Sequence, residues 1–184
     1  DERWEYVKKF NVLEKMEKAK AEGKIRHIGF SFHDSYESFK RILNAYDGWE
    51  FCQIMLNYMD VNYQAGMAGL EDAHEKGLAV VIMEPLRGGL LANPPADVAG
   101  VYEAFDAKRS PVEWAFRYLY AMPEVVTILS GMSNWEQTVD NLRIFDIPER
   151  PVLTEKEHEL FKTAKATYLA RMKTGCTGCR YCQP

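Results

Sequence analysis

The chain has 184 residues, a formal net charge of −4 at pH 7 and a hydrophobic fraction of 47%, values typical of one globular domain or of part of a larger one. The acidic balance excludes a basic face for nucleic acid, so we expect no nucleic-acid partner. The longest apolar run, residues 78–83, is too short to span a bilayer, and no signal-peptide pattern opens the sequence. We therefore expect a cytoplasmic protein that does not enter a membrane.

Helix-like and strand-like patterns alternate along the first half of the chain. Apolar residues at helical spacing predict a helix over residues 11–22, which ends at Gly23. Residues 25–31 form the first predicted strand. A helix follows over residues 35–46, with Ser35 as its N-cap.

The second predicted strand covers residues 51–56, and the third, which is the most apolar, covers residues 78–83. A helix over residues 63–76 is predicted between them. Residues 85–100 are rich in glycine and proline and predict a long loop. Loops of that length inside a compact domain are usually functional.

The fourth predicted strand, residues 125–129, runs through Ser130-Gly131 straight into a helix that Ser133 and Glu136 are expected to cap. Unpaired N–H groups and the positive end of the helix dipole would then form an anion site above the strand. The alternative is an ordinary turn without a ligand. The helix is expected to turn four apolar residues inwards, namely Trp135, Val139, Leu142 and Phe145.

Two further capping boxes predict helices on either side of this unit. Ser110 with Glu113 starts a helix before the fourth strand, and Thr154 with Glu157 starts a tail helix that runs to about residue 173.

Four strand–helix pairs and a tail helix predict an α/β fold with a parallel sheet. Four such units make either half of an eight-stranded barrel or a short open sheet. Small, polar or glycine-rich residues follow the strands directly, as at Ser31, Asn57 and Ser130. Since barrel sites are built at the carboxyl ends of the strands, we favour half of a barrel.

Three of the four cysteines, Cys176, Cys179 and Cys182, lie in the last nine positions, whereas Cys52 is expected to be a small core residue. The spacing C-x2-C-x2-C matches the start of the bacterial ferredoxin run, whose thiolates hold a 4Fe–4S cluster. The chain stops at Pro184, before the fourth cysteine of that run, so we interpret it as a fragment. A structural zinc site is the competing interpretation.

Four segments and the cysteine tail resemble the aldo/keto reductase family. In order they are GKIRHIGFS, CQIMLNY, VVIMEPLRGGLL and VTILSGMSNWEQTVDNL, and the tail CTGCRYCQP resembles the family's iron–sulfur-bearing subset. The resemblance implies the C-terminal half of a (β/α)8 TIM barrel in residues 1–150, with a tail helix and truncated iron–sulfur motif in residues 151–184. It also implies hydride transfer between NAD(P)H and a small-molecule carbonyl or alcohol.

The resemblance also implies a set of cofactor-binding residues. Ser31 and Gln53 match positions that hydrogen-bond the nicotinamide carboxamide, and Gln53 is hard to explain in an apolar strand without a partner. Asn141 could instead bond the neighbouring loop. The remaining matches run along the pyrophosphate, at Pro85, Leu86, Gly88 and Gly89, and along the adenosine, at Gly131, Ser133, Gln137 and Asn141.

The sequence departs from the family pattern at three places. Phe32 follows Ser31 where the family usually has asparagine, and Met83 stands where an aromatic residue often stacks on the nicotinamide. Met132 and Gln137 stand where members that prefer NADPH offer a cation for the 2′-phosphate. The choice between NADH and NADPH therefore stays open.

We predict no catalytic residue in this chain, because the family's Tyr, Lys, Asp and His lie on strands that would precede Asp1. The chain alone is expected to be inactive. Among the histidines, His27 is expected in the core, His74 and His158 on solvated helix positions, and only His33 ends a strand.

Three functions remain to be compared. The first is the cofactor-binding half of an NAD(P)H-dependent aldo/keto oxidoreductase. The second is an iron–sulfur electron-transfer or partner-docking module, with a redox partner, on a non-catalytic barrel. The third is a domain that binds nicotinamide without turning it over.

Overall fold

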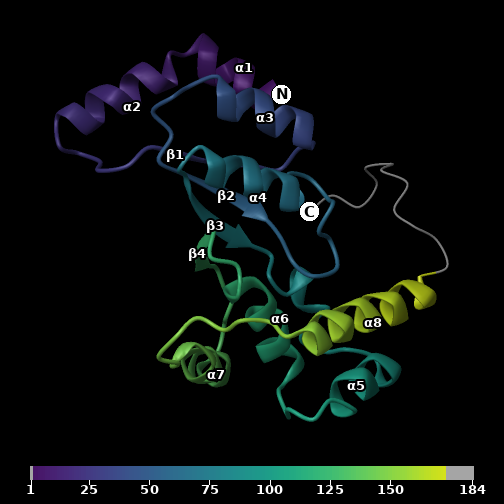
Figure 1. Ribbon diagram of the computed structural model, residues 1–184. Helices are drawn as coiled ribbons and strands as arrows, with labels where there is room; N and C mark the ends of the chain where they lie inside the picture. Colours follow the sequence, from purple (N-terminus) through teal and green to yellow (C-terminus); the bar gives the residue numbers. More distant parts are fainter. Residues whose placement is uncertain (1, 173–184) are drawn as a thin grey trace.

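Four parallel strands lie at the centre of the computed structural model, which describes residues 2–172. They pair in the order β1-β2-β3-β4, which confirms the parallel α/β sheet expected from the alternating pattern (Figure 1). The strands are β1 (Gly29–Ser31), β2 (Phe51–Met55), β3 (Ala79–Met83) and β4 (Val125–Ile128).

The helices gather on two sides of this sheet in Figure 1. The first group precedes β3 in the chain and consists of α1 (Glu2–Lys9), α2 (Val12–Ala21), α3 (Tyr36–Asn44) and α4 (Gly66–Glu75). The second group follows β3 and consists of α5 (Ala96–Glu103), α6 (Pro111–Tyr120), α7 (Trp135–Phe145) and α8 (Glu155–Arg171). A short 3-10 turn, η1 (Arg87–Gly89), lies between β3 and α5. Within the described part of the chain no helix is both long and apolar enough to cross a bilayer.

The first hydrophobic core lies between the sheet and the helices α3 and α4. Cys52, Ile54, Val80 and Ile82 alternate along β2 and β3, are fully buried, and pack in one cluster with residues of α3 and α4 such as Phe39. The opposite face of the sheet carries Ser31, Gln53 and Val81, which are only half-buried or exposed. One face of the sheet is therefore packed like a barrel exterior, and the other is open.

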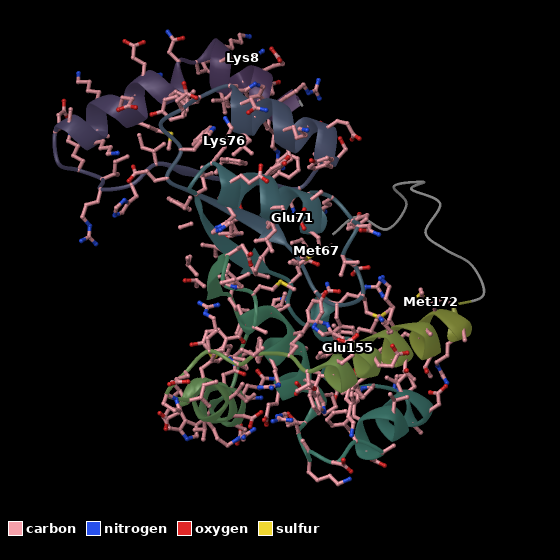
Figure 2. All side chains as sticks on the ribbon, viewed as in Figure 1. Lys8, Met67, Glu71, Lys76, Glu155 and Met172 are labelled. Carbon is pink, nitrogen blue, oxygen red and sulfur yellow. The ribbon has the colours of Figure 1, made fainter. Side chains whose placement is uncertain are left out.

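A second core joins the turn after β2 to α5, α6 and α8. Trp114, Phe161 and Tyr168 are buried there, with Leu91 from the loop after β3. Figure 2 marks the two ends of α8 with Glu155 and Met172, and Figure 1 shows the helix running beside α5. This core ties the loop after β3 to the C-terminal helix.

The helix caps follow the sequence at three of the four predicted sites. Ser35, Ser110 and Thr154 each accept a hydrogen bond from the backbone N–H three residues later, and Thr154 forms a full capping box with Glu157. At α7 the predicted cap was wrong, because Asn134 rather than Ser133 takes the N-cap position.

Other expectations need correction. Helix α1 was not expected, and α5 begins inside the predicted loop over residues 85–100. Trp135 of α7 is 75% exposed and Leu142 is 66% exposed, so most of the expected inner stripe points outwards. Phe145 packs against Phe116 as expected, and Ile144, which was not predicted, is buried beside it. His27 is not a core residue, because its exposed ring pairs with Glu50 at 2.7 Å.

Candidate functional site

Ser31 and Gln53 form a polar pair on neighbouring strands, where Ser31 ends β1 and Gln53 is the middle residue of β2. The register of the sheet places Ser31 of β1 directly opposite Gln53 of β2. Gln53 Nε2 donates to Ser31 Oγ at 2.9 Å and also reaches the sulfur of Met83 at 3.4 Å. Gln53 Oε1 has no hydrogen-bond partner among the residues that the structure describes, so the pair keeps an acceptor free for a ligand.

The loop after β3, residues 84–91, has an unusual backbone. Glu84 and Arg87 have φ of 55° and 50°, and Gly88 and Gly89 have φ of 63° and 93°. Left-handed backbone costs non-glycine residues on the order of 1–3 kcal/mol each. An added Cβ at Gly88 or Gly89 would meet no atom within 4 Å, so the space beside both glycines is open.

The turn between β4 and α7 is held by its own side chains. Asn134 Oδ1 accepts from Gln137 N at 2.9 Å, and Gln137 Oε1 accepts from Ser133 N at 2.8 Å. Asn141 Nδ2 donates to Ser130 Oγ at 2.8 Å, so Asn141 bonds the neighbouring loop, the alternative raised from the sequence. In the first turn of α7 the N–H group of Gln137 is therefore already satisfied, as is that of Ser133 just before the helix.

These two loops enclose a cleft of about 650 Å³ beside the ends of β3 and β4. The residues that sequence reasoning assigned to the cofactor and that line this cleft are Pro85, Leu86, Gly88, Gly89, Gly131, Gln137 and Asn141. The other three candidates, Ser31, Gln53 and Ser133, do not line it. Each of them lies in or after one of the four parallel strands of a single sheet.

The charge of the cleft comes from residues that the sequence did not single out. Glu84 and Asp140 line it, and Asp140 pairs with Arg143 at 2.9 Å. Of the described residues in the lining, none is a lysine, an arginine or a histidine. A ligand phosphate would therefore rely on backbone N–H groups and on the N-terminal end of α7.

Tyr58 has the wrong surroundings for proton transfer to a ligand. It is 3% exposed, and its hydroxyl lies 2.6 Å from that of Tyr102. Burial, followed by the nearby Tyr102, raises the pKa of Tyr58 far above its usual value of 10. The tyrosine therefore belongs to the second core.

The predicted metal ligands Cys176, Cys179 and Cys182 lie outside the described residues. Among residues 2–172, no group of three or more His, Cys, Asp and Glu side chains is placed to hold a metal ion. Cys52 is fully buried as predicted, and burial raises the pKa of its thiol to about 12. It is therefore unsuited to ligate a metal as a thiolate.

The chain belongs to the aldo/keto reductase family, whose sequence profile matches residues 2–165. This matches the resemblance that the four strand segments carried. A search of curated proteins found no relative that matches the chain.

Several solved structures share the fold. The aldo-keto reductase AKR11C1 from Bacillus halodurans, in its holo form, is 21% identical with a TM-score of 0.63, and the match covers 80% of this chain and 53% of that one. An aldo-keto reductase from Klebsiella pneumoniae in complex with NADPH is 24% identical with a TM-score of 0.60, covering 83% of this chain and 53% of that one. The thermostable aldo-keto reductase Tm1743, in complex with the inhibitor epalrestat, gives a TM-score of 0.60 at 24% identity, covering 81% and 52%. The chain thus spans about half the length of these structures.

Proposed function

We propose that this chain supplies the cofactor-binding half of an NAD(P)H-dependent aldo/keto oxidoreductase. The bound nicotinamide would exchange a hydride with a small carbonyl substrate or its alcohol. Membership of the family supports the reaction class, and the arrangement of the strand ends and the cleft supports the cofactor.

The observation that carries the proposal is the hydrogen-bonding state of Ser31 and Gln53. Ser31 Oγ accepts from Gln53 Nε2, so the hydroxyl hydrogen of Ser31 is available to donate. Gln53 Oε1 has no partner among the described residues and is available to accept. A primary carboxamide offers one acceptor and an NH₂ donor, so it complements both groups at once.

The cleft fits the rest of a dinucleotide. Gly88 and Gly89 leave the backbone open to a pyrophosphate, because side chains at these positions would stand in the open space beside the loop. Glu84 and Asp140 line the cleft, Arg143 already pairs with Asp140, and no described lining residue is a cation that could bind a further phosphate. We therefore propose that NADH binds more tightly than NADPH.

The open face of the sheet supports half of a (β/α)8 barrel. β1 and β4 each have one neighbouring strand, and the face that carries Ser31, Gln53 and Val81 is incompletely buried. In a closed barrel this face would pack against the remaining strands. We propose that those strands carry the catalytic Tyr, Lys, Asp and His, so that this chain alone is inactive.

A second candidate function rests on the cysteine motif. The spacing of Cys176, Cys179 and Cys182 favours a 4Fe–4S cluster, and hence electron transfer to a redox partner. Iron and sulfide analysis of the complete polypeptide tests this candidate; stoichiometric zinc would contradict it.

The proposed function is tested by titrating the complete polypeptide with NADH, NADPH and ADP-ribose, which lacks the nicotinamide. We expect NADH to bind most tightly and ADP-ribose to bind more weakly than NADH, because only the nicotinamide reaches Ser31 and Gln53. Equal affinities for NADH and ADP-ribose, or no binding, would contradict the proposal. Oxidation of NADH on addition of an aldehyde is the matching activity assay.

A further inference from the structure

The loop over residues 84–91, here called the cleft loop, lines the proposed dinucleotide site in a conformation that its own sequence does not favour. Glu84 and Arg87 are non-glycine residues with left-handed backbone, at φ of 55° and 50°. Such residues persist only where surrounding structure holds them. The contacts that hold this loop come from the turn after β2 and from α8.

The first contact fixes the start of the cleft loop. Asn57 is fully buried, and its Nδ2 donates to the carbonyl of Glu84 at 3.3 Å. Asn57 Oδ1 accepts from the backbone N–H groups of Met59 and Asp60, both at 3.0 Å. One amide therefore shapes its own turn and restrains the first left-handed residue of the loop.

The second contact fixes the middle of the cleft loop. Arg87 Nε lies 2.7 Å from Asp60 Oδ2, and the two side chains are 31% and 17% exposed. An ion pair so far removed from solvent is screened less than a surface pair. It holds the side chain of the second left-handed residue next to the turn after β2.

The third contact fixes the end of the cleft loop. Tyr168 of α8 donates its hydroxyl to the carbonyl of Leu90 at 3.2 Å, and Leu91 is fully buried in the second core. Asn57, Asp60 and Tyr168 do not line the cleft, so they act on a ligand only through the loop.

We propose that Asn57, Asp60 and Tyr168 form a clamp that holds the cleft loop in the conformation that binds the dinucleotide, with the Asp60–Arg87 pair as its central contact. These are positioning residues, and the inference rests on the proposed function of the cleft. Without the pair, Arg87 relaxes toward ordinary backbone, and only a fraction of molecules keeps a competent loop. The apparent dissociation constant rises by the inverse of that fraction.

The clamp is tested in the complete polypeptide with Asp60→Asn, which keeps the size of the side chain and removes its charge. Asp97→Asn is the matched control, because Asp97 pairs with Arg171 at 3.0 Å between α5 and α8, away from the cleft. A reversed pair, Asp60→Arg with Arg87→Asp, restores the attraction, and aspartate tolerates left-handed backbone better than arginine. The readouts are the dissociation constants of NADH and ADP-ribose and the amide hydrogen exchange of the cleft loop without ligand.

In the Asp60→Asn variant we expect about a tenth of the molecules to keep the cleft loop in its binding conformation. Both ligands should therefore bind about tenfold more weakly. Amide exchange in the cleft loop should accelerate while exchange in β2 and β3 stays unchanged. Asp97→Asn should leave both readouts within about twofold of the wild type, and the reversed pair should recover most of the affinity. An Asp60→Asn variant that exchanges and binds like Asp97→Asn would overturn the clamp.

The two hypotheses fail in different ways. If the wild type binds neither ligand, the proposed function fails, and the exchange experiment alone decides the clamp. If the wild type binds and Asp60→Asn changes neither readout, the clamp fails and the proposed function stands.

Discussion

The strand-end pair and the cleft loop contribute to the same candidate site by different physical means. Ser31 and Gln53 face each other because two parallel strands pair in one register. The cleft loop owes its shape to residues far along the chain, from the turn after β2 and from α8. The proposed nicotinamide end is therefore built by the sheet itself, whereas the proposed phosphate end depends on support from the second core.

The largest expected effect comes from breaking the ion pair between Arg117 and Glu157 of α8, because α8 is part of the second core that supports the cleft loop. Arg117 bonds the carboxylate of Glu157, which is 3% exposed and also caps α8, at 2.7 Å. Burial tends to raise the pKa of Glu157, but the Arg117 and Thr154 contacts outweigh it and leave the pKa lowered. Arg117→Met would leave the charge buried and should lower the free energy of unfolding by about 3 kcal/mol at pH 7.

Denaturant unfolding of wild type and Arg117→Met at several pH values measures this effect. In the variant, Glu157 keeps its Thr154 contacts and Arg109 at 3.9 Å but loses its closest cation, so burial raises its pKa relative to the wild type and the deficit should shrink as acid protonates the carboxyl group. A deficit that stays constant from pH 7 to pH 4 would contradict this explanation.

The next effect separates the cleft loop from the strand ends. Gly89 has φ of 93°, which a β-branched residue does not tolerate, so Gly89→Val should shift the loop. A strain of about 2 kcal/mol in the bound conformation corresponds to about 30-fold weaker binding, and we expect this loss for both NADH and ADP-ribose. Isothermal titration of both ligands checks this, and a variant that weakens NADH alone would contradict the assignment of the loop to phosphate.

Gly100→Ala is the matched control for that substitution. Gly100 lies inside α5, and an added Cβ would meet no atom within 4 Å. Replacing it should stabilise the protein by about 0.5–1 kcal/mol through helix propensity, with both dissociation constants unchanged.

A smaller and more selective effect is expected at the strand ends. Gln53→Leu removes the free amide oxygen and the bond to Ser31 while keeping the volume of the side chain. NADH should bind about tenfold more weakly, the loss of about 1.4 kcal/mol expected for hydrogen bonding to the carboxamide. ADP-ribose should bind as before. Equal losses for both ligands would show that Gln53 acts through the general fold of the sheet.

The smallest effect concerns the start of β1. Hydrogen bonds from Lys20 and then from His27 lower the pKa of Glu50 from 4.5 to about 2, and Glu50 also accepts from the backbone of Ile28. Because the folded pKa lies below the ordinary value, this stabilisation is present above pH 4.5 and is lost as the pH falls toward 2. The melting temperature of Glu50→Gln should trail that of the wild type at pH 6 and meet it near pH 2; a gap that persists there would contradict the assignment.

The sequence predicts those structural features that depend on residues close together in the chain. The four strands, three helix caps and the unusual position of Gln53 in an apolar strand could be predicted from the sequence, because capping and alternation depend on residues a few positions apart. His27 was misplaced because its partner Glu50 lies far along the chain, directly before β2. Likewise, nothing local to Arg87 reveals that Asp60 lies beside it.

The outward face of α7 shows a further reason why prediction fails. Trp135, Val139 and Leu142 have helical spacing that indicates a buried stripe, yet they are largely exposed here. Periodicity shows that a face is apolar but not what covers it. The N-cap of the same helix was misjudged for a simpler reason, since Asn134 caps a helix as well as Ser133 does.

The most direct test of the dinucleotide site is hydrogen exchange of the complete polypeptide with and without saturating NADH. Protection should appear together in four segments, residues 29–33, 51–55, 84–91 and 130–137, because one ligand would reach from the strand ends through the cleft. Protection confined to one of these segments, or found only elsewhere in the chain, would contradict a single dinucleotide site along this edge of the sheet.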